Sequence, residues 1–150
     1  MSLTVKITTP IFQTLSDLKE QYGFDELGLA VSGGSDSLAM LYICNDWALK
    51  NEVKLHCITV DHKLRSESEK EAESVTNHCS GLGINHEIVE WKHEENIAGN
   101  LSDLARSARY ELIDKWRKGL SFVLVGHTQN DQIETFFMNL KRGSGIEGLK

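Results

Sequence analysis

Six consecutive small or polar residues have the types that a phosphate-binding loop needs. They are Ser32, Gly33, Gly34, Ser35, Asp36 and Ser37. Glycines let a phosphate approach the backbone, and serine hydroxyls can donate hydrogen bonds to it. A carboxylate in such a loop repels a phosphate unless a cation lies between them, so Asp36 is predicted to be a magnesium ligand. The alternative is a serine- and glycine-rich turn that only precedes a helix.

The flanking sequence places this loop between a strand and a helix. Residues 27–31 form a short apolar run that predicts a buried strand, and a helix is predicted to begin at Leu38 and to end near Lys50. The first turn of a helix leaves backbone N–H groups without partners and carries the positive end of the helix dipole. The sequence therefore predicts an anion site at this junction.

A second set of reactive side chains follows a predicted strand over residues 122–125. His127 lies in the exit loop of this strand, and a helix is predicted over residues 132–142. Because Asp131 and Glu134 are spaced i, i+3, a helix start would place both carboxylates on one face. The pair could bind a metal, orient a base or hold a cationic substrate. The alternative is that these acids only complement the helix dipole.

Hydrophobic periodicity predicts that strands and helices alternate along the whole chain. Further strands are predicted over residues 53–60 and 84–90, and further helices over residues 10–22, 66–82 and 100–118. Strands joined by helices form right-handed βαβ units. We therefore expect an α/β fold, a doubly wound and mainly parallel sheet with helices on both faces. Residues 61–65 then fall at the carboxyl end of a strand, where such folds place ligand contacts.

Several other polar residues have ordinary structural explanations. Arg109 falls off the apolar stripe of its predicted helix, as a solvated charge would. Ser66 and Glu69 have the spacing of a capping box at a helix start. His86 and His93 are predicted to be solvated rather than metal ligands, because no third ligand falls at a suitable spacing.

Length and composition are typical of one globular domain without a membrane span. The chain has 150 residues, of which 40% are hydrophobic and 25% are charged. Its three cysteines form no CxxC pair, which favours reduced thiols and a cytoplasmic location. The formal net charge of −6 argues against a general nucleic-acid binder, so affinity for an RNA would have to come largely from elsewhere.

The hexapeptide SGGSDS resembles the S-G-G-x-D-S loop of the PP-loop ATP pyrophosphatases, whose fold is adenine nucleotide alpha hydrolase-like. Further blocks resemble, in order and spacing, the N-terminal catalytic domain of the tRNA(Ile)-lysidine synthetase family. They are VDHKLRSES, NLSDLARSARYELI and GHTQNDQIETFFMNLKRGSGIEGL. The resemblance implies an ATP-dependent ligase that adenylates the wobble cytidine of an isoleucine tRNA with a CAU anticodon. The side-chain amine of free lysine then displaces AMP.

This resemblance implies a role for each matching residue. The loop from Ser32 to Ser37 would hold the phosphates of ATP, with Asp36 on Mg²⁺. Asp131 and Glu134 would hold the charged groups of lysine. Arg109 and His127 would lie at the reacting centre and stabilise negative charge.

The chain also departs from the family's pattern. Thr128 stands where members often carry a second histidine, and Asn130 where they often carry a second acid. The family's C-terminal tRNA-binding modules do not follow, so we expect residues 1–150 to be a PP-loop domain and a fragment of a longer enzyme. The alternatives are a tRNA thiolase, a small-molecule amide synthetase such as NAD synthetase, or a nucleotide-binding module without catalysis. The absence of a CxxC pair argues against the thiolase, and the R-G-S-G block argues against the amide synthetase.

Overall fold

A single five-stranded sheet forms the centre of the molecule. The computed structural model describes residues 3–64, 66–93, 99–129 and 132–139. Its strands are β1 (Glu26–Ala30), β2 (Lys54–Asp61), β3 (Asn85–Glu90), β4 (Phe122–Gln129) and β5 (Gln132–Asn139). They lie in the order β3-β2-β1-β4-β5. The first four strands run parallel, and β5 pairs with β4 in the antiparallel sense.

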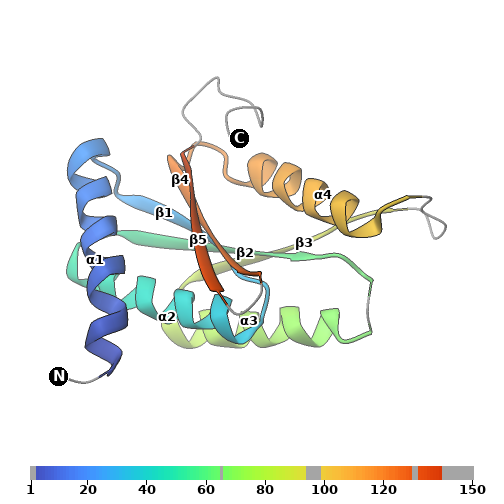
Figure 1. Ribbon diagram of the computed structural model, residues 1–150, viewed down its shortest axis with the longest axis horizontal. Coiled ribbons are helices and arrows are strands. Elements are labelled where there is room, and N and C mark those ends of the chain that lie inside the picture. The colour runs from blue at the N-terminus through green and yellow to red at the C-terminus, as the bar shows by residue number, and fades with distance from the viewer. Residues whose placement is uncertain (1–2, 65, 94–98, 130–131, 140–150) are drawn as a thin grey trace.

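Helices cover the sheet on both faces, which confirms the doubly wound α/β fold. They are α1 (Leu3–Tyr22), α2 (Ser35–Lys50), α3 (Ser68–Leu82) and α4 (Leu101–Trp116). Figure 1 shows α2 and α3 on one side of the sheet and α4 on the other. The connection from β1 to β2 therefore lies on one face, and α4, which leads into β4, lies on the opposite face.

The side chains of β1 alternate between two hydrophobic clusters. Leu27 and Leu29 belong to the larger cluster, as does Val31 directly after the strand, and α1, α2 and α3 complete this cluster. Ala30 belongs to the smaller cluster, to which α4 contributes Ile113. This double coverage explains why β1 is apolar after its exposed first residue, Glu26, instead of alternating with polar residues.

The helix predicted over residues 132–142 is wrong in its described part. Residues 132–139 form β5, whose register opposes Phe122 to Asn139 and Gln129 to Gln132. This segment is rich in β-branched and aromatic residues, which favour a strand over a helix. The exit loop predicted over residues 126–131 is also wrong as far as residue 129, because β4 continues to Gln129.

Three predicted helix starts differ from the structure. The helix after the phosphate loop begins at Ser35 rather than Leu38, so the loop is shorter than expected. The expected capping box does not form: α3 begins at Ser68, and its N-cap residue, Glu67, makes no side-chain capping bond. At the N-terminus, α1 begins at Leu3 and includes Pro10, although proline removes one hydrogen-bond donor from a helix interior.

The three cysteines are free thiols inside the protein. Cys44 of α2, Cys57 of β2 and Cys79 of α3 are all buried in the larger hydrophobic cluster. Burial raises the pKa of the Cys44 thiol to about 12. The structure confirms the expected apolar surroundings of these residues.

None of the helices within the described residues is both long enough and apolar enough to cross a bilayer.

Gly28 sets how closely α4 approaches the sheet. A Cβ atom at this position would lie 3.0 Å from Val123 Cγ2, 3.1 Å from Leu120 Cδ1 and 3.2 Å from Trp116 Cζ3. We expect Gly28→Ala to lower the free energy of unfolding by about 1–3 kcal/mol through overpacking. Denaturant unfolding measures this change.

A glycine in α3 provides the matched control. Gly81 has no heavy atom within 4 Å of its would-be Cβ, so Gly81→Ala should stabilise the protein by about 0.5–1 kcal/mol through helix propensity. An unchanged stability of Gly28→Ala would contradict the close approach of α4.

Candidate functional site

The phosphate loop connects β1 to α2 at the carboxyl edge of the sheet. Gly33 has a φ of 92°, a left-handed conformation that side chains disfavour, and Gly34 is the N-cap of α2. The Ser37 hydroxyl holds the loop closed: it accepts from the Ser32 N–H at 3.2 Å and donates to the Gly34 carbonyl at 3.0 Å. Since Ser37 is only 3% exposed, its hydroxyl stabilises the loop from the protein interior.

The first turn of α2 leaves backbone donors available to a ligand. The first intrahelical bond runs from the Leu38 N–H to the Gly34 carbonyl, and Gly34 makes no side-chain capping bond. The N–H groups of Ser35, Asp36 and Ser37 therefore have no intrahelical partner, which is the condition for an anion site. Asp36 is half-buried in this turn and forms no hydrogen bond or ion pair with any residue that the structure describes.

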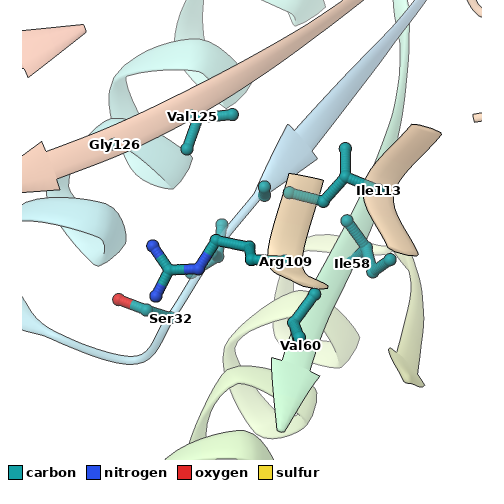
Figure 2. Close-up of a pocket in the computed structure, with 9 residues that line it drawn as sticks. Ser32, Ile58, Val60, Arg109, Ile113, Val125 and Gly126 are labelled. Carbon is teal, nitrogen blue, oxygen red and sulfur yellow. The ribbon is translucent and has the colours of Figure 1, made fainter. Parts of the chain in front are cut away.

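Arg109 of α4 reaches this edge of the sheet from the opposite face. It lines one cavity together with Ser32, Val125 and Gly126, and Figure 2 shows its guanidinium directed toward Ser32. Gly126 packs closely against the first turn of α2, because a Cβ atom at Gly126 would lie 3.4 Å from the Ser37 Cα atom. Arg109 was predicted only through the family resemblance, and the structure brings it together with the phosphate loop.

A second cavity of about 130 Å³ lies at the end of β2 and is also lined by Arg109. Its lining residues are mostly polar. They are Ser32, Thr59, Val60, Asp61, His62, Leu64, Ser68, Glu71 and Arg109. Ser32, Val60 and Arg109 line both cavities, so the two cavities adjoin beside the phosphate loop.

Asp61 is a buried carboxylate at the floor of the second cavity. It is 4% exposed, accepts from the Lys63 backbone N–H at 2.9 Å and pairs with the Lys63 ammonium at 3.2 Å. Burial raises the pKa of Asp61. Hydrogen bonds from Lys63 and Ser68 and the positive charge of Lys63 lower this pKa by more than burial raises it. The net pKa of Asp61 is lowered, so its charge is retained at neutral pH.

His62 is in direct contact with Arg109. The Nε2 atom of His62 lies 3.4 Å from both Nε and Nη2 of Arg109. Burial and the neighbouring positive charge of Arg109 lower the pKa of His62. Burial also lowers the pKa of Arg109, although a guanidinium stays charged in proteins.

The residues of the second predicted set are only partly described. Asp131 lies outside the described residues, and the side chains of His127 and Glu134 do as well. Their backbones lie opposite each other, with His127 of β4 paired with Glu134 of β5. Because Glu134 belongs to a strand, the argument that a helix places Asp131 and Glu134 on one face is wrong. The roles of both acids rest on the family resemblance.

Asp61 and His62 belong to residues 61–65, which the sequence placed where such folds make ligand contacts without assigning either residue its own role, and the structure places both in the cavity wall. The available signal was their position directly after an apolar strand. His86 and His93 are not simply solvated as expected. His86 lies 2.8 Å from Thr59 Oγ1 and 3.0 Å from Thr76 Oγ1, and His93 Nε2 lies 3.1 Å from the His62 carbonyl. Among the described residues, no three histidines, cysteines or acids are grouped as a metal site.

A comparison with known families decides how this loop is classified. The family described as the PP-loop domain matches residues 7–150. The chain belongs to the PP-loop family. This membership confirms the family expected from the SGGSDS hexapeptide, and it implies ATP binding.

Proteins described as tRNA(Ile)-lysidine synthases are similar to this PP-loop chain. The protein of Wolbachia pipientis wMel is 41% identical over 143 residues, covering 93% of this chain and 33% of that protein. The protein of Ruegeria pomeroyi is 46% identical over 125 residues, covering 82% of this chain and 30% of that protein. The chain thus spans about a third of the length of these curated relatives.

Two solved structures share the fold. A tRNA thiolase from Methanococcus maripaludis has a TM-score of 0.63 and 21% identity, covering 79% of this chain and 45% of its own. A glutamine-dependent NAD⁺ synthetase from Acinetobacter baumannii has a TM-score of 0.65 and 18% identity, covering 87% and 26%. At these identities the likeness concerns the fold alone, and it confirms the expected architecture.

Substitutions at two neighbouring glycines distinguish an effect on the shape of the loop from an effect on the access of phosphate to it. A Cβ at Gly33 would meet the Glu71 carbonyl at 3.0 Å in a left-handed conformation, so we expect Gly33→Ala to cost about 1–3 kcal/mol of stability and to weaken ATP binding. Calorimetric titration with ATP and denaturant unfolding measure both effects.

The adjacent glycine is the matched control for this prediction. Gly34 has a φ of −69°, and its would-be Cβ lies 3.7 Å from Ser32 Oγ. Gly34→Ala should change stability by less than about 1 kcal/mol and still weaken ATP binding, because the methyl group lies where a phosphate approaches. Unchanged ATP affinity in both variants would remove the loop from the nucleotide site.

Proposed function

We propose that this chain is the ATP-binding catalytic domain of a ligase that attaches lysine to the wobble cytidine of an isoleucine tRNA with a CAU anticodon. ATP adenylates a cytidine oxygen with release of pyrophosphate, and the lysine amine then displaces AMP. One observation carries the proposal: the phosphate loop and Arg109 meet at one edge of the sheet, in a chain similar to tRNA(Ile)-lysidine synthases. The reaction takes place in the cytoplasm, which three free thiols support.

The loop binds the triphosphate through the N–H groups that begin α2. A helix N-terminus favours negative charge, and Gly33 and Gly34 leave its backbone accessible. A magnesium ion fits here because Asp36 offers a half-buried carboxylate that no described residue engages. Mg²⁺ typically takes one or two carboxylates together with phosphate oxygens and water. When bound, it screens the charge of the phosphates.

The protein's part in the chemistry is alignment and charge stabilisation. Adenylation makes the cytidine oxygen a good leaving group, so little covalent help is required. Arg109 faces Ser32 and carries a permanent positive charge that stabilises the negative charge developing on phosphate. By the family resemblance, His127 also stabilises negative charge at the reacting centre. Asp131 and Glu134 bind the charged groups of free lysine.

Transfer of labelled lysine into tRNA tests the reaction. With ATP, Mg²⁺ and the longest available form of the protein, we expect incorporation of lysine and none of alanine, glutamine or ammonia. Asp36→Ala should lose magnesium-dependent ATP use while it remains folded, because the carboxylate that bridges to the cation is gone. Removal of Mg²⁺ by a chelator should act on the wild type in the same way.

Each other outcome points to a different assignment. No incorporation of lysine would contradict the ligase, and release of AMP and pyrophosphate without any substrate dependence would favour another PP-loop activity. ATP binding without turnover would favour a nucleotide-binding module. Normal activity of Asp36→Ala would remove this residue from the site.

Glu134→Gln tests the assignment of lysine to β5. We expect the variant to require a much higher lysine concentration, by roughly tenfold or more, because a carboxylate that binds a cationic group contributes about 1.5–3 kcal/mol. The ATP requirement should change little. Steady-state kinetics with each substrate varied in turn separate the two. An increased ATP requirement with unchanged lysine dependence would show that Glu134 contributes to ATP binding and not to lysine binding.

A further inference from the structure

Arg109 and His62 form a contact at the carboxyl edge of the sheet that the proposed chemistry does not use. Arg109 comes from α4, and His62 directly follows β2. Two guanidinium nitrogens, Nε and Nη2, approach the same imidazole nitrogen at 3.4 Å. The guanidinium that His62 contacts is the one directed toward Ser32 of the phosphate loop.

This contact determines which nitrogen of the neutral imidazole carries the proton. A guanidinium has only donors, so Nε2 of His62 must accept, and the imidazole proton must reside on Nδ1. The Nδ1 atom is buried and has no hydrogen-bond partner among the described residues. A buried N–H without a partner is unfavourable, so Arg109 is the interaction that selects this tautomer.

The surroundings of His62 hold its backbone and ring in place. Its carbonyl lies 3.1 Å from His93 Nε2, and its ring packs edge-to-face against Trp91 at a centroid distance of 5.9 Å. Trp91 in turn donates its backbone N–H to the Asp61 carbonyl at 2.8 Å. The imidazole is therefore a rigid acceptor rather than a mobile side chain.

Charged and titratable groups face His62 from every element around it. Arg109 of α4 and His93 beyond β3 oppose protonation, whereas Asp61 of β2 favours it. Glu71 of α3 lines the same cavity, and the Asp61 charge is shared with Lys63. Burial and Arg109 outweigh Asp61, because the pKa of His62 is lowered. The imidazole is thus neutral at pH 7.

We propose that His62 is a positioning residue: its neutral imidazole holds the Arg109 guanidinium beside the phosphate loop, and protonation releases it. A protonated imidazole has no acceptor for Arg109 and places a like charge 3.4 Å from it. Arg109 then withdraws from Ser32, and nucleotide affinity falls. This inference rests on the proposed function only in that Arg109 faces a nucleotide phosphate.

The pH dependence of ATP affinity tests this role in the 150-residue chain. Calorimetric titration between pH 8 and pH 5.5 should give a steeper loss of ATP affinity toward acid pH for the wild type than for His62→Gln. Glutamine keeps an acceptor near the position of Nε2 but does not titrate. The difference between the two should reach about tenfold at the acid end, as expected for one hydrogen bond to a charged group. Comparing variants at each pH cancels the titration of ATP itself.

His86→Gln is the matched control. His86 is also half-buried, with a pKa that burial lowers, but it contacts Thr59 and Thr76 instead of Arg109. This variant should retain the wild-type acid limb. If His62→Gln retains it as well, His62 does not position Arg109 through its protonation state.

Histidine NMR gives a second readout that needs no nucleotide. With ¹⁵N-labelled histidine, His62 should show the neutral form with its proton on Nδ1, and Arg109→Gln should shift this tautomer equilibrium. A His62 signal that is protonated at pH 7, or unchanged by Arg109→Gln, would overturn the proposal. If no ATP binds at any pH, the proposed function fails, whereas the NMR result still decides the His62–Arg109 pair.

Discussion

The parallel pairing of β1 with β2 on one side and with β4 on the other determines where a ligand can bind. The chain leaves β1 along one face of the sheet, through α2, and enters β4 from the opposite face, through α4. Connections that diverge from one point leave a crevice at the carboxyl edge, where open α/β sheets bind their ligands. The phosphate loop, Arg109 and both cavities lie at this edge. A site of this kind needs no dedicated domain, since the topology produces it.

The parts of the site that the sequence predicted are those encoded by local chemistry. The SGGSDS loop combines glycines and a helix start within six residues, and the buried run before it identifies β1. The β4–β5 hairpin was missed because residues 132–142 were assigned to a helix, although β-branched and aromatic residues within 132–139 favour a strand. The contact between His62 and Arg109 joins residues 47 positions apart. No pattern in one sequence reveals a contact over such a separation.

Electrostatic balance explains why a protein with a net charge of −6 can hold an anion at this edge. The first turn of α2 and the Arg109 guanidinium supply local positive potential, and the Asp61 carboxylate is neutralised by Lys63. A neutral His62 can contact Arg109 without adding a second positive charge. The local field, not the total charge, decides which ligands this edge of the sheet can bind.

The reactivity of the three buried thiols reports local opening of the folded protein. Each belongs to a different element, α2, β2 or α3, and none is reachable by solvent in the folded state. A thiol reacts as its thiolate, so a buried thiol reacts only when its surroundings open. Cys57 and Cys79 interact with each other, so the labelling rates of the three thiols under native conditions report the opening of the contact between β2 and α3 and of the core around Cys44. These native cysteines report local opening of the core without any substitution in the chain.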